Sequence, residues 1–265
     1  MAERIALVTG ASRGIGRGIA VALGARGWTV WVTGRSTPEH RTSHLPGTVH
    51  DTAAEVDHAG GHGVPVACDH RDDDQVRSLH DRLASESDRL DLLVNNVWAG
   101  YERLNAGAWE EWNAPFWEQP IELFDAMFLS GVRAHYVTAT LFAPMLIAAA
   151  EPLMVTVSMQ ITPAQQAGFG VAYGMAKSAC DRFALAAAEQ LREHQVTSVS
   201  LHPGLVRTEG VMQFAADLDL TDSQSPEGVG RAVAALAADP GKRATTGQAL
   251  TVAELARRYR LDVRT

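Results

Sequence analysis

Short runs of apolar residues alternate along the chain with longer segments in which apolar positions recur at helical spacing. The runs are rich in β-branched residues and have the length of strands buried on both faces. Seven runs occur, at residues 5–9, 29–33, 63–68, 90–95, 153–158, 196–201 and 248–252. Helical periodicity is found near residues 14–26, 48–59, 72–85, 121–149, 172–194 and 226–238. This alternation predicts a parallel sheet that right-handed crossovers cover with helices on both faces.

Two segments do not follow this alternation. Residues 36–47 are polar, contain Pro38 and Pro46, and are predicted to form a long loop after the second strand. Residues 98–120 hold four of the six tryptophans, together with Tyr101 and Phe116. This aromatic segment is either a local hydrophobic patch or subunit contact, or a wall or lid over an apolar substrate beyond the fourth strand.

Length and composition favour one globular domain. The chain has 265 residues without a linker, and 46% of its residues are hydrophobic while 20% are charged. We therefore expect residues 1–265 to form one α/β domain of three layers, α/β/α, around a doubly wound seven-stranded sheet. Residues near 98–120 would be an aromatic-rich insertion. Ligands of such sheets bind at the carboxyl ends of the strands.

The charge balance excludes several partners and compartments. A formal net charge of −8 with scattered arginines argues against a nucleic-acid partner. The uncharged residues 152–176 contain prolines, glutamines and glycines, so they would span a membrane poorly. A core strand begins almost at the first residue, which leaves no room for a secretory signal. Cys68 and Cys180 are too few for a disulfide framework or a metal cluster, and a reducing cytoplasm is the expected location.

A glycine-rich turn separates the first apolar run from the first helical segment. Residues 9–16 read Thr-Gly-Ala-Ser-Arg-Gly-Ile-Gly. Gly10 permits the tight bend, while Gly14 and Gly16 let the backbone approach a phosphate and let the helix pack closely on the strand. The backbone amides and the helix dipole can then hold a pyrophosphate. A helix start without a ligand would not explain three glycines that lower helix stability.

The second motif is a tyrosine and a lysine four residues apart, Tyr173 and Lys177, which place a phenol and an ammonium on one helix face. Each motif alone is common. In this order and at this separation they resemble the short-chain dehydrogenase/reductase family. Strings such as NNVWAGYE, GVRAHY and YGMAKSACDR are most similar to the group of the mammalian dehydrogenase/reductase SDR family member 1 and its bacterial relatives. The resemblance covers essentially the whole chain and implies a Rossmann-type sheet and an NADPH-linked carbonyl reductase.

The end of the second strand indicates which nicotinamide cofactor binds. NAD enzymes usually place an acid there, on the ribose 2′-hydroxyl, whereas this chain has Gly34 followed by Arg35. Arg13 in the glycine turn is the second cation that the family uses to grip a 2′-phosphate, and guanidinium groups suit that contact. These residues favour NADP(H). The resemblance assigns further cofactor contacts to Ser12, Ile15, Asp69, Asn95, Pro203, Gly204, Val206 and Thr208.

The resemblance also implies the chemistry. Tyr173 would exchange the proton of the substrate oxygen, and Lys177 would lower the pKa of that phenol from its ordinary value of about 10 and bond the nicotinamide ribose. Ser158, at the end of the fifth strand, would polarise the carbonyl. Ser158 lies two residues farther from Tyr173 than the family's usual serine, and the usual offset falls on Gln160. Either the loop has an insertion, or Gln160 or Thr162 supplies the hydrogen bond.

A larger departure lies in the long helix, where Phe128 takes the place of the family's proton-relay asparagine. The expected function is an NADP(H)-dependent oxidoreductase that interconverts an apolar ketone or aldehyde and an alcohol. The alternatives are a nucleotide-binding protein with weak or no catalysis and an NAD-dependent dehydrogenase. The family also implies a homodimer or homotetramer formed through the helices near 121–149 and 172–194, whose alanine-rich faces allow close packing.

Overall fold

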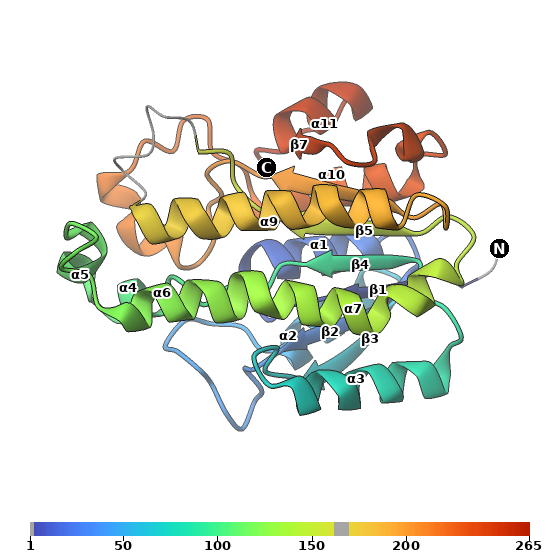
Figure 1. The fold of residues 1–265 in the computed structure, drawn as a ribbon, viewed down its shortest axis with the longest axis horizontal. Helices are drawn as coiled ribbons and strands as arrows, with labels where there is room; N and C mark the ends of the chain where they lie inside the picture. Colours follow the sequence, from blue (N-terminus) through green and yellow to red (C-terminus); the bar gives the residue numbers. More distant parts are fainter. Residues whose placement is uncertain (1–2, 162–169) are drawn as a thin grey trace.

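The computed structural model describes residues 3–161 and 170–265, in which one parallel sheet lies between two layers of helices (Figure 1). The strands are β1 (Ile5–Val8), β2 (Thr29–Gly34), β3 (His62–Ala67), β4 (Leu92–Asn95), β5 (Leu153–Val157), β6 (Thr197–His202) and β7 (Ala249–Thr251). Their order is β3-β2-β1-β4-β5-β6-β7, and all pairings are parallel. The predicted Rossmann-type α/β fold is confirmed.

The strands lie within two residues of the predicted runs because both faces of the sheet are covered. All residues of β1, β2, β4, β5 and β6 are buried. The predicted fourth strand begins too early. The amide of Leu90 donates to the carbonyl oxygen of Met145 at the end of a helix, so Leu90 leaves the strand ladder although it is apolar.

Two sets of helices cover the two faces of the sheet. One face packs against α1 (Gly14–Gly24), α2 (Val49–His58), α10 (Pro226–Ala238) and α11 (Val252–Tyr259). The other face packs against α3 (Asp73–Glu86), α7 (Ala134–Ile147) and α9 (Val171–Gln190), which lie side by side in Figure 1. Within the two described ranges, no helix combines the length and apolar character needed to cross a bilayer.

The long helix predicted over residues 121–149 is interrupted. It consists of α6 (Ile121–Phe128), a π-helical turn (Leu129–Arg133) and α7. A Cβ on Gly131 in this turn would lie 2.3 Å from the Trp98 ring, and Ser130 Oγ accepts a hydrogen bond from the Ala99 amide at 2.8 Å. The π turn therefore accommodates the chain that leaves β4, and such turns are frequent at functional sites.

The sequence analysis did not predict several short helices. They are α4 (Glu102–Asn105), α5 (Trp109–Asn113), the 3₁₀ segments Val211–Asp217 and Lys242–Thr245, and α11. Helices of four or five residues are too short to show a periodicity. A start signal for α11 is present in the sequence, because Thr251 and Glu254 form a capping box.

Candidate functional site

The glycine turn lies between β1 and α1 at the carboxyl edge of the sheet. Gly10 and Gly14 adopt φ values of +65° and +57°, which favour glycine. A Cβ on Gly10 would lie 2.7 Å from the Cα of Val97. Asn96 Nδ2 donates to the carbonyl oxygens of Thr9 and Gly10 at 2.9 and 3.0 Å. The residues that follow β4 therefore hold the turn in shape, and their closeness requires glycine.

The segment after β6 lies against this turn. A Cβ on Gly14 would lie 3.3 Å from Thr208 Cγ2, and the Gly14 amide donates to Glu209 Oε2 at 2.9 Å. Gly204 has a φ of +76°, and Val206 forms a bridge with Gln224. The structure thus brings the predicted residues after β6 to the glycine turn. It adds Glu209, a carboxylate bound to an amide at the start of α1.

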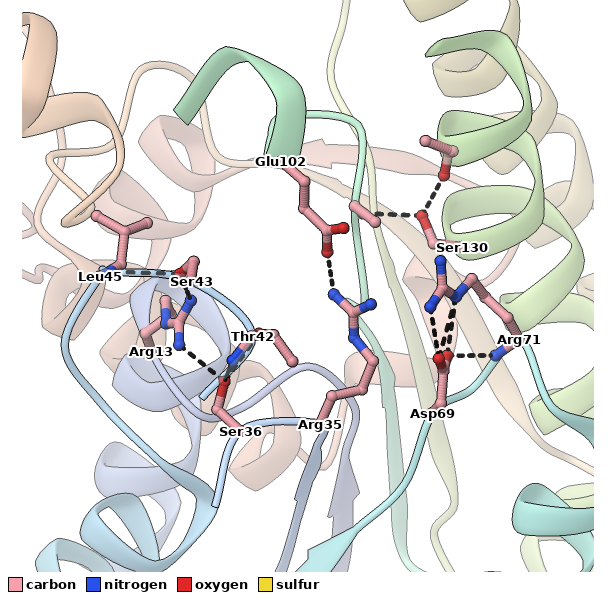
Figure 2. A network of polar contacts seen from close by, with 12 residues as sticks. Arg13, Arg35, Ser36, Thr42, Ser43, Leu45, Asp69, Arg71, Glu102 and Ser130 are labelled. Atoms are coloured by element: carbon pink, nitrogen blue, oxygen red, sulfur yellow. Dashed lines mark hydrogen bonds and ion pairs between the residues drawn. The ribbon is translucent and has the colours of Figure 1, made fainter. Parts of the chain in front are cut away.

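Two arginines lie near the end of β2. Arg13 Nη2 and Nη1 donate to Ser36 Oγ (2.9 Å) and Ser43 Oγ (2.8 Å), whereas Arg35 forms an ion pair with Glu102 of α4 (Figure 2). Gly34, the last residue of β2, brings no carboxylate to this place. The structure therefore brings Arg13 and Arg35 to the same strand end, with Arg35 engaged by an acid that sequence analysis did not single out.

Asp69 and Asn95, the other residues predicted on the adenosine side, have different surroundings. The Asp69 carboxylate accepts hydrogen bonds from Arg71 Nε at 3.0 Å and Nη2 at 2.6 Å (Figure 2). Asn95 ends β4 and is fully buried, yet its side-chain nitrogen and oxygen have no hydrogen-bond partner among the described residues. Buried polar groups are normally hydrogen-bonded. The Asn95 amide is therefore well suited to a polar ligand.

Tyr173 and Lys177 project from α9 beside the residues that hold the glycine turn. Their side chains are only 3% and 7% exposed. Lys177 Nζ lies 3.7 Å from the centroid of the Trp98 ring and 5.6 Å from that of the Tyr173 ring. The ammonium is thus held by a cation–π contact. Because Trp98 follows Asn96 by two residues, one short segment contacts both the glycine turn and the Tyr173–Lys177 pair.

The electrostatics of this pair differ from expectation. Burial raises the pKa of Tyr173 well above its ordinary value. Burial likewise lowers the pKa of Lys177. The expected lowering of the Tyr173 pKa is not found. The reason is that the Lys177 amine lies on the indole ring, so desolvation of the phenol outweighs attraction between the two groups.

The exit of β5 places a sulfur atom, and not the predicted serine, at the Tyr173 hydroxyl. Ser158 Oγ donates to the Lys177 carbonyl oxygen at 2.9 Å, while Met159 Sδ lies 3.4 Å from the Tyr173 hydroxyl. Gln160 is exposed, and Thr162 lies outside the described residues. In this structure the Ser158 hydroxyl is therefore hydrogen-bonded to α9 and not to the Tyr173 hydroxyl, and its role at the carbonyl stays a prediction.

The aromatic segment divides into an inner and an outer set. The rings of Trp98, Tyr101 and Trp112 lie 5.5, 5.9 and 6.0 Å from the Tyr173 ring. The Tyr101 hydroxyl donates to the Tyr173 hydroxyl at 2.8 Å. By contrast, the side chains of Phe116 and Trp117 are 59% and 72% exposed. The inner set therefore lies against Tyr173, whereas the outer set is exposed, and both interpretations of the segment stay predictions.

A family model described as short chain dehydrogenase matches residues 4–219. The chain belongs to the short-chain dehydrogenase family. Members of this family are oxidoreductases, so the chain is an enzyme of the dehydrogenase/reductase type.

Relatives of this short-chain dehydrogenase match it over nearly its whole length. It is 40% identical to dehydrogenase/reductase SDR family member 1 of Mus musculus and 38% identical to that of Homo sapiens. Each alignment covers 98% of this chain and 83% of the relative. A solved short chain dehydrogenase from Mycobacterium thermoresistibile is 27% identical with a TM-score of 0.82, covering 97% of this chain and 88% of that one. The predicted family and group are confirmed.

Short-chain dehydrogenases bind a nicotinamide cofactor, and the described residues fit its adenosine half. The glycine turn offers backbone amides without Cβ atoms, and Asn95 offers an unsatisfied amide. The residues on the side of the site where the nicotinamide would react depart from the family pattern. Phe128 stacks on Phe124 with ring centroids 4.2 Å apart and brings no amide to the position of the relay asparagine.

Four residues at the site were missed by sequence reasoning as functional candidates: Tyr101, Glu102, Met159 and Glu209. Met159 and Glu209 directly follow predicted site residues, Ser158 and Thr208, so their neighbourhood was a usable signal. Tyr101 was recognised only as part of the aromatic segment. Its contact with Tyr173 joins residues 72 positions apart, which no local pattern indicates.

Proposed function

We propose that this short-chain dehydrogenase is an NADP(H)-dependent oxidoreductase that interconverts a ketone or aldehyde and an alcohol, with Tyr173 as the general acid/base. One observation carries the proposal. Residues that directly follow β4 hold the glycine turn through Asn96 and contact both Tyr173 and Lys177 through Trp98. A dinucleotide on the glycine turn would therefore extend toward the phenol.

The side chains divide the chemistry among them. When bound, the dinucleotide supplies the hydride for the carbonyl carbon. Tyr173 gives its proton to the carbonyl oxygen, and its raised pKa keeps the phenol protonated at neutral pH. Lys177 orients the nicotinamide ribose. The apolar wall of Trp98 and Trp112 excludes water and favours an apolar substrate.

Preference for NADP(H) rests on the end of β2. Gly34 leaves no carboxylate to repel a 2′-phosphate, and Arg13 and Arg35 provide two guanidinium groups there. To bind the 2′-phosphate, Arg35 must break its ion pair with Glu102. The phosphate is a dianion and offers more acceptor oxygens than the Glu102 carboxylate. Glu102 is thus the competitor of the phosphate.

The cofactor assignment is tested by two variants with opposite effects. Arg35→Ala is expected to weaken NADPH binding by about 10- to 100-fold and to leave NADH binding nearly unchanged, because only NADPH carries the 2′-phosphate. Glu102→Gln releases Arg35 and is expected to tighten NADPH binding by roughly threefold. Fluorescence titration with both nucleotides measures these effects. Arg133→Ala is the matched control, because Arg133 pairs with Asp73 outside the site. Equal affinity for the two nucleotides before and after Arg35→Ala would refute the assignment.

Glu209 is expected to compete with the pyrophosphate. Its carboxylate accepts the Gly14 amide hydrogen that the proposed function gives to a phosphate oxygen. Glu209→Gln removes the negative charge with little change in shape and should tighten NADPH binding by about three- to tenfold. Glu227→Gln, which removes a carboxylate that pairs with Arg17, is the control in the same titration. Weaker binding by Glu209→Gln would show that Glu209 supports the site.

A second candidate function is a nucleotide-binding protein with weak or no catalysis. The thioether of Met159 at the Tyr173 hydroxyl favours it, because a thioether cannot donate a hydrogen bond to a substrate oxygen. Absorbance of the nicotinamide during incubation with a panel of aromatic and alicyclic ketones and aldehydes distinguishes the two. Tight NADPH binding without turnover of any member would favour the second candidate.

The proposal includes self-association of the chain through the surface formed by α7 and α9. Both helices expose apolar side chains, among them Tyr136 at 59%, Met175 at 50% and Leu185 at 38%. Phe128, at the end of α6, lines a surface depression together with Tyr136 of α7 and Phe183 of α9. A second copy that covers this surface would remove it from water.

A further inference from the structure

We propose that Tyr101 is a catalytic residue that donates a hydrogen bond to the reacting oxygen of Tyr173 and stabilises the phenolate formed during carbonyl reduction. The inference rests on the proposed function, in which Tyr173 is the proton donor. The Tyr101 and Tyr173 hydroxyl oxygens lie 2.8 Å apart, with Tyr101 as the donor. Tyr101 comes from the chain between β4 and α4, a different part of the sequence from α9.

The β5-exit residues described beside Tyr173 show what the Tyr101 hydroxyl adds. Ser158 Oγ is bound to the Lys177 carbonyl oxygen, and Met159 Sδ faces the phenol. Sulfur of a thioether accepts hydrogen bonds weakly and donates none. The hydroxyl of Tyr101 therefore brings to the reacting oxygen a donor that neither β5-exit residue provides in this structure.

Packing holds Tyr101 in the geometry that donation requires. Its ring lies 5.4 Å from that of Trp112 and 6.0 Å from that of Trp98, in edge-on or tilted contacts that fix an aromatic ring. Burial raises the pKa of Tyr101 to about 12, so its hydroxyl stays protonated at neutral pH. A buried, protonated and immobilised phenol is a donor ready before reaction.

The chemical step balances once water restores the proton of Tyr173. As hydride reaches the carbonyl carbon, the Tyr173 O–H bond breaks, its proton joins the substrate oxygen, and the electron pair stays on the phenolate. Tyr101 keeps its own proton and donates to that phenolate. A hydrogen bond to the charged form favours that form, so Tyr101 lowers the barrier to proton transfer. The phenolate then regains a proton from water.

The test replaces Tyr101 by phenylalanine, which preserves the ring and removes only the hydroxyl. With NADPH and the best substrate of the carbonyl panel, Tyr101→Phe is expected to lower kcat by about 10- to 100-fold, with NADPH affinity unchanged. In alcohol oxidation with NADP⁺ the phenolate acts as the base. In Tyr101→Phe the pH at which the oxidation rate rises should therefore be about one to two units higher than in the wild type. A purely structural role would not move this pH profile. Tyr259→Phe, which removes a hydroxyl that donates to Asp239 outside the site, is the matched control.

Two further measurements distinguish the loss of the Tyr101 hydroxyl from a folding defect in Tyr101→Phe. Met159→Gln, which is close to methionine in length, places an amide donor near the sulfur's position and should restore part of the kcat of Tyr101→Phe. The chain has four tyrosines, so isotope labelling of the hydroxyl-bearing ring carbon gives few NMR signals. Tyr101→Phe should shift the Tyr173 signal more than those of Tyr136 and Tyr259, whether or not substrate is present.

The outcomes distinguish the role of Tyr101 from the proposed oxidoreductase function. If Tyr101→Phe retains wild-type kcat and pH profile while Tyr173→Phe loses activity, the role of Tyr101 is refuted and the proposed function stands. Retained activity in Tyr173→Phe overturns both. No turnover of any carbonyl by the wild type overturns the proposed function and, with it, the role of Tyr101. Lost kcat in Tyr101→Phe with an unmoved pH profile and no rescue by Met159→Gln assigns Tyr101 a structural role only.

Discussion

Tyr173→Phe is expected to lower kcat for carbonyl reduction by about 10²- to 10⁴-fold, the usual contribution of a positioned general acid. The ring remains, so its contacts with Trp98 and Trp112 should persist and NADPH affinity should stay close to that of the wild type. Steady-state kinetics with the carbonyl panel, combined with fluorescence titration of NADPH, measures both quantities. Wild-type turnover in this variant would mean that another group supplies the proton.

The direction of the Tyr173 pKa shift sets the pH dependence of the same reaction. Burial raises this pKa above 10, so the phenol stays protonated across the neutral and mildly alkaline range. Reduction, which uses the protonated form, should therefore not decline as pH rises toward 10. Oxidation of an alcohol uses the phenolate and should accelerate throughout that range. A reduction rate that falls near neutral pH would indicate a proton donor with a lower pKa.

Acid is expected to destabilise the fold through two buried histidines. His70 bonds Thr33 and Thr138 through its two ring nitrogens, and His135 Nε2 bonds the Val97 carbonyl oxygen. Burial lowers the pKa of His70 from 6.5 to about 4 and that of His135 from 6.5 to about 3. Both histidines are neutral in the folded protein at neutral pH, so the unfolded chain binds more protons once pH falls below 6.5.

The sign and size of the acid effect follow from these pKa values. The stability contributed by neutral burial is complete above pH 6.5 and is lost as pH falls toward the folded pKa values. Between pH 7 and pH 5 each histidine should cost about 2 kcal/mol, and the pair about 4 kcal/mol, of the free energy of unfolding. That loss is large beside the roughly 5–15 kcal/mol of a typical domain.

Urea unfolding at the two pH values measures this loss. The double variant His70→Gln, His135→Gln should show little of the pH dependence, whatever its stability at neutral pH. His194→Gln, at an exposed position beyond α9, is the control and should retain it. A double variant that loses as much stability in acid as the wild type would place the effect in other groups.

Many features of the site depend on residues that are local in sequence and were predictable. The strands follow from apolar runs buried on both faces, and the glycine turn from three glycines between a strand and a helix. Tyr173 and Lys177 share a helix face because four residues make about one helical turn. Such patterns act within a few residues, so they can be recognised without knowing the fold.

Other features join residues that are far apart in the chain. Glu209 meets Gly14 across 195 positions, Tyr101 meets Tyr173 across 72, and Arg35 meets Glu102 across 67. Each pair meets because parallel strands deliver their following loops to one edge of the sheet. Which side chains touch there depends on loop paths, such as the π turn that accommodates Trp98.

The sequence by itself determined the layered α/β fold, the family, the glycine turn and the order of the motifs, because these are set by periodicity and turn residues over short distances. Only the tertiary structure decided the surroundings of the phenol. In the folded chain the Ser158 hydroxyl bonds a carbonyl oxygen of α9, and Met159 and Tyr101 contact the Tyr173 hydroxyl. The Lys177 ammonium lies over the Trp98 ring. The physical reason is that hydrogen bonds and desolvation depend on which groups meet in three dimensions, and spacing along the chain does not specify that.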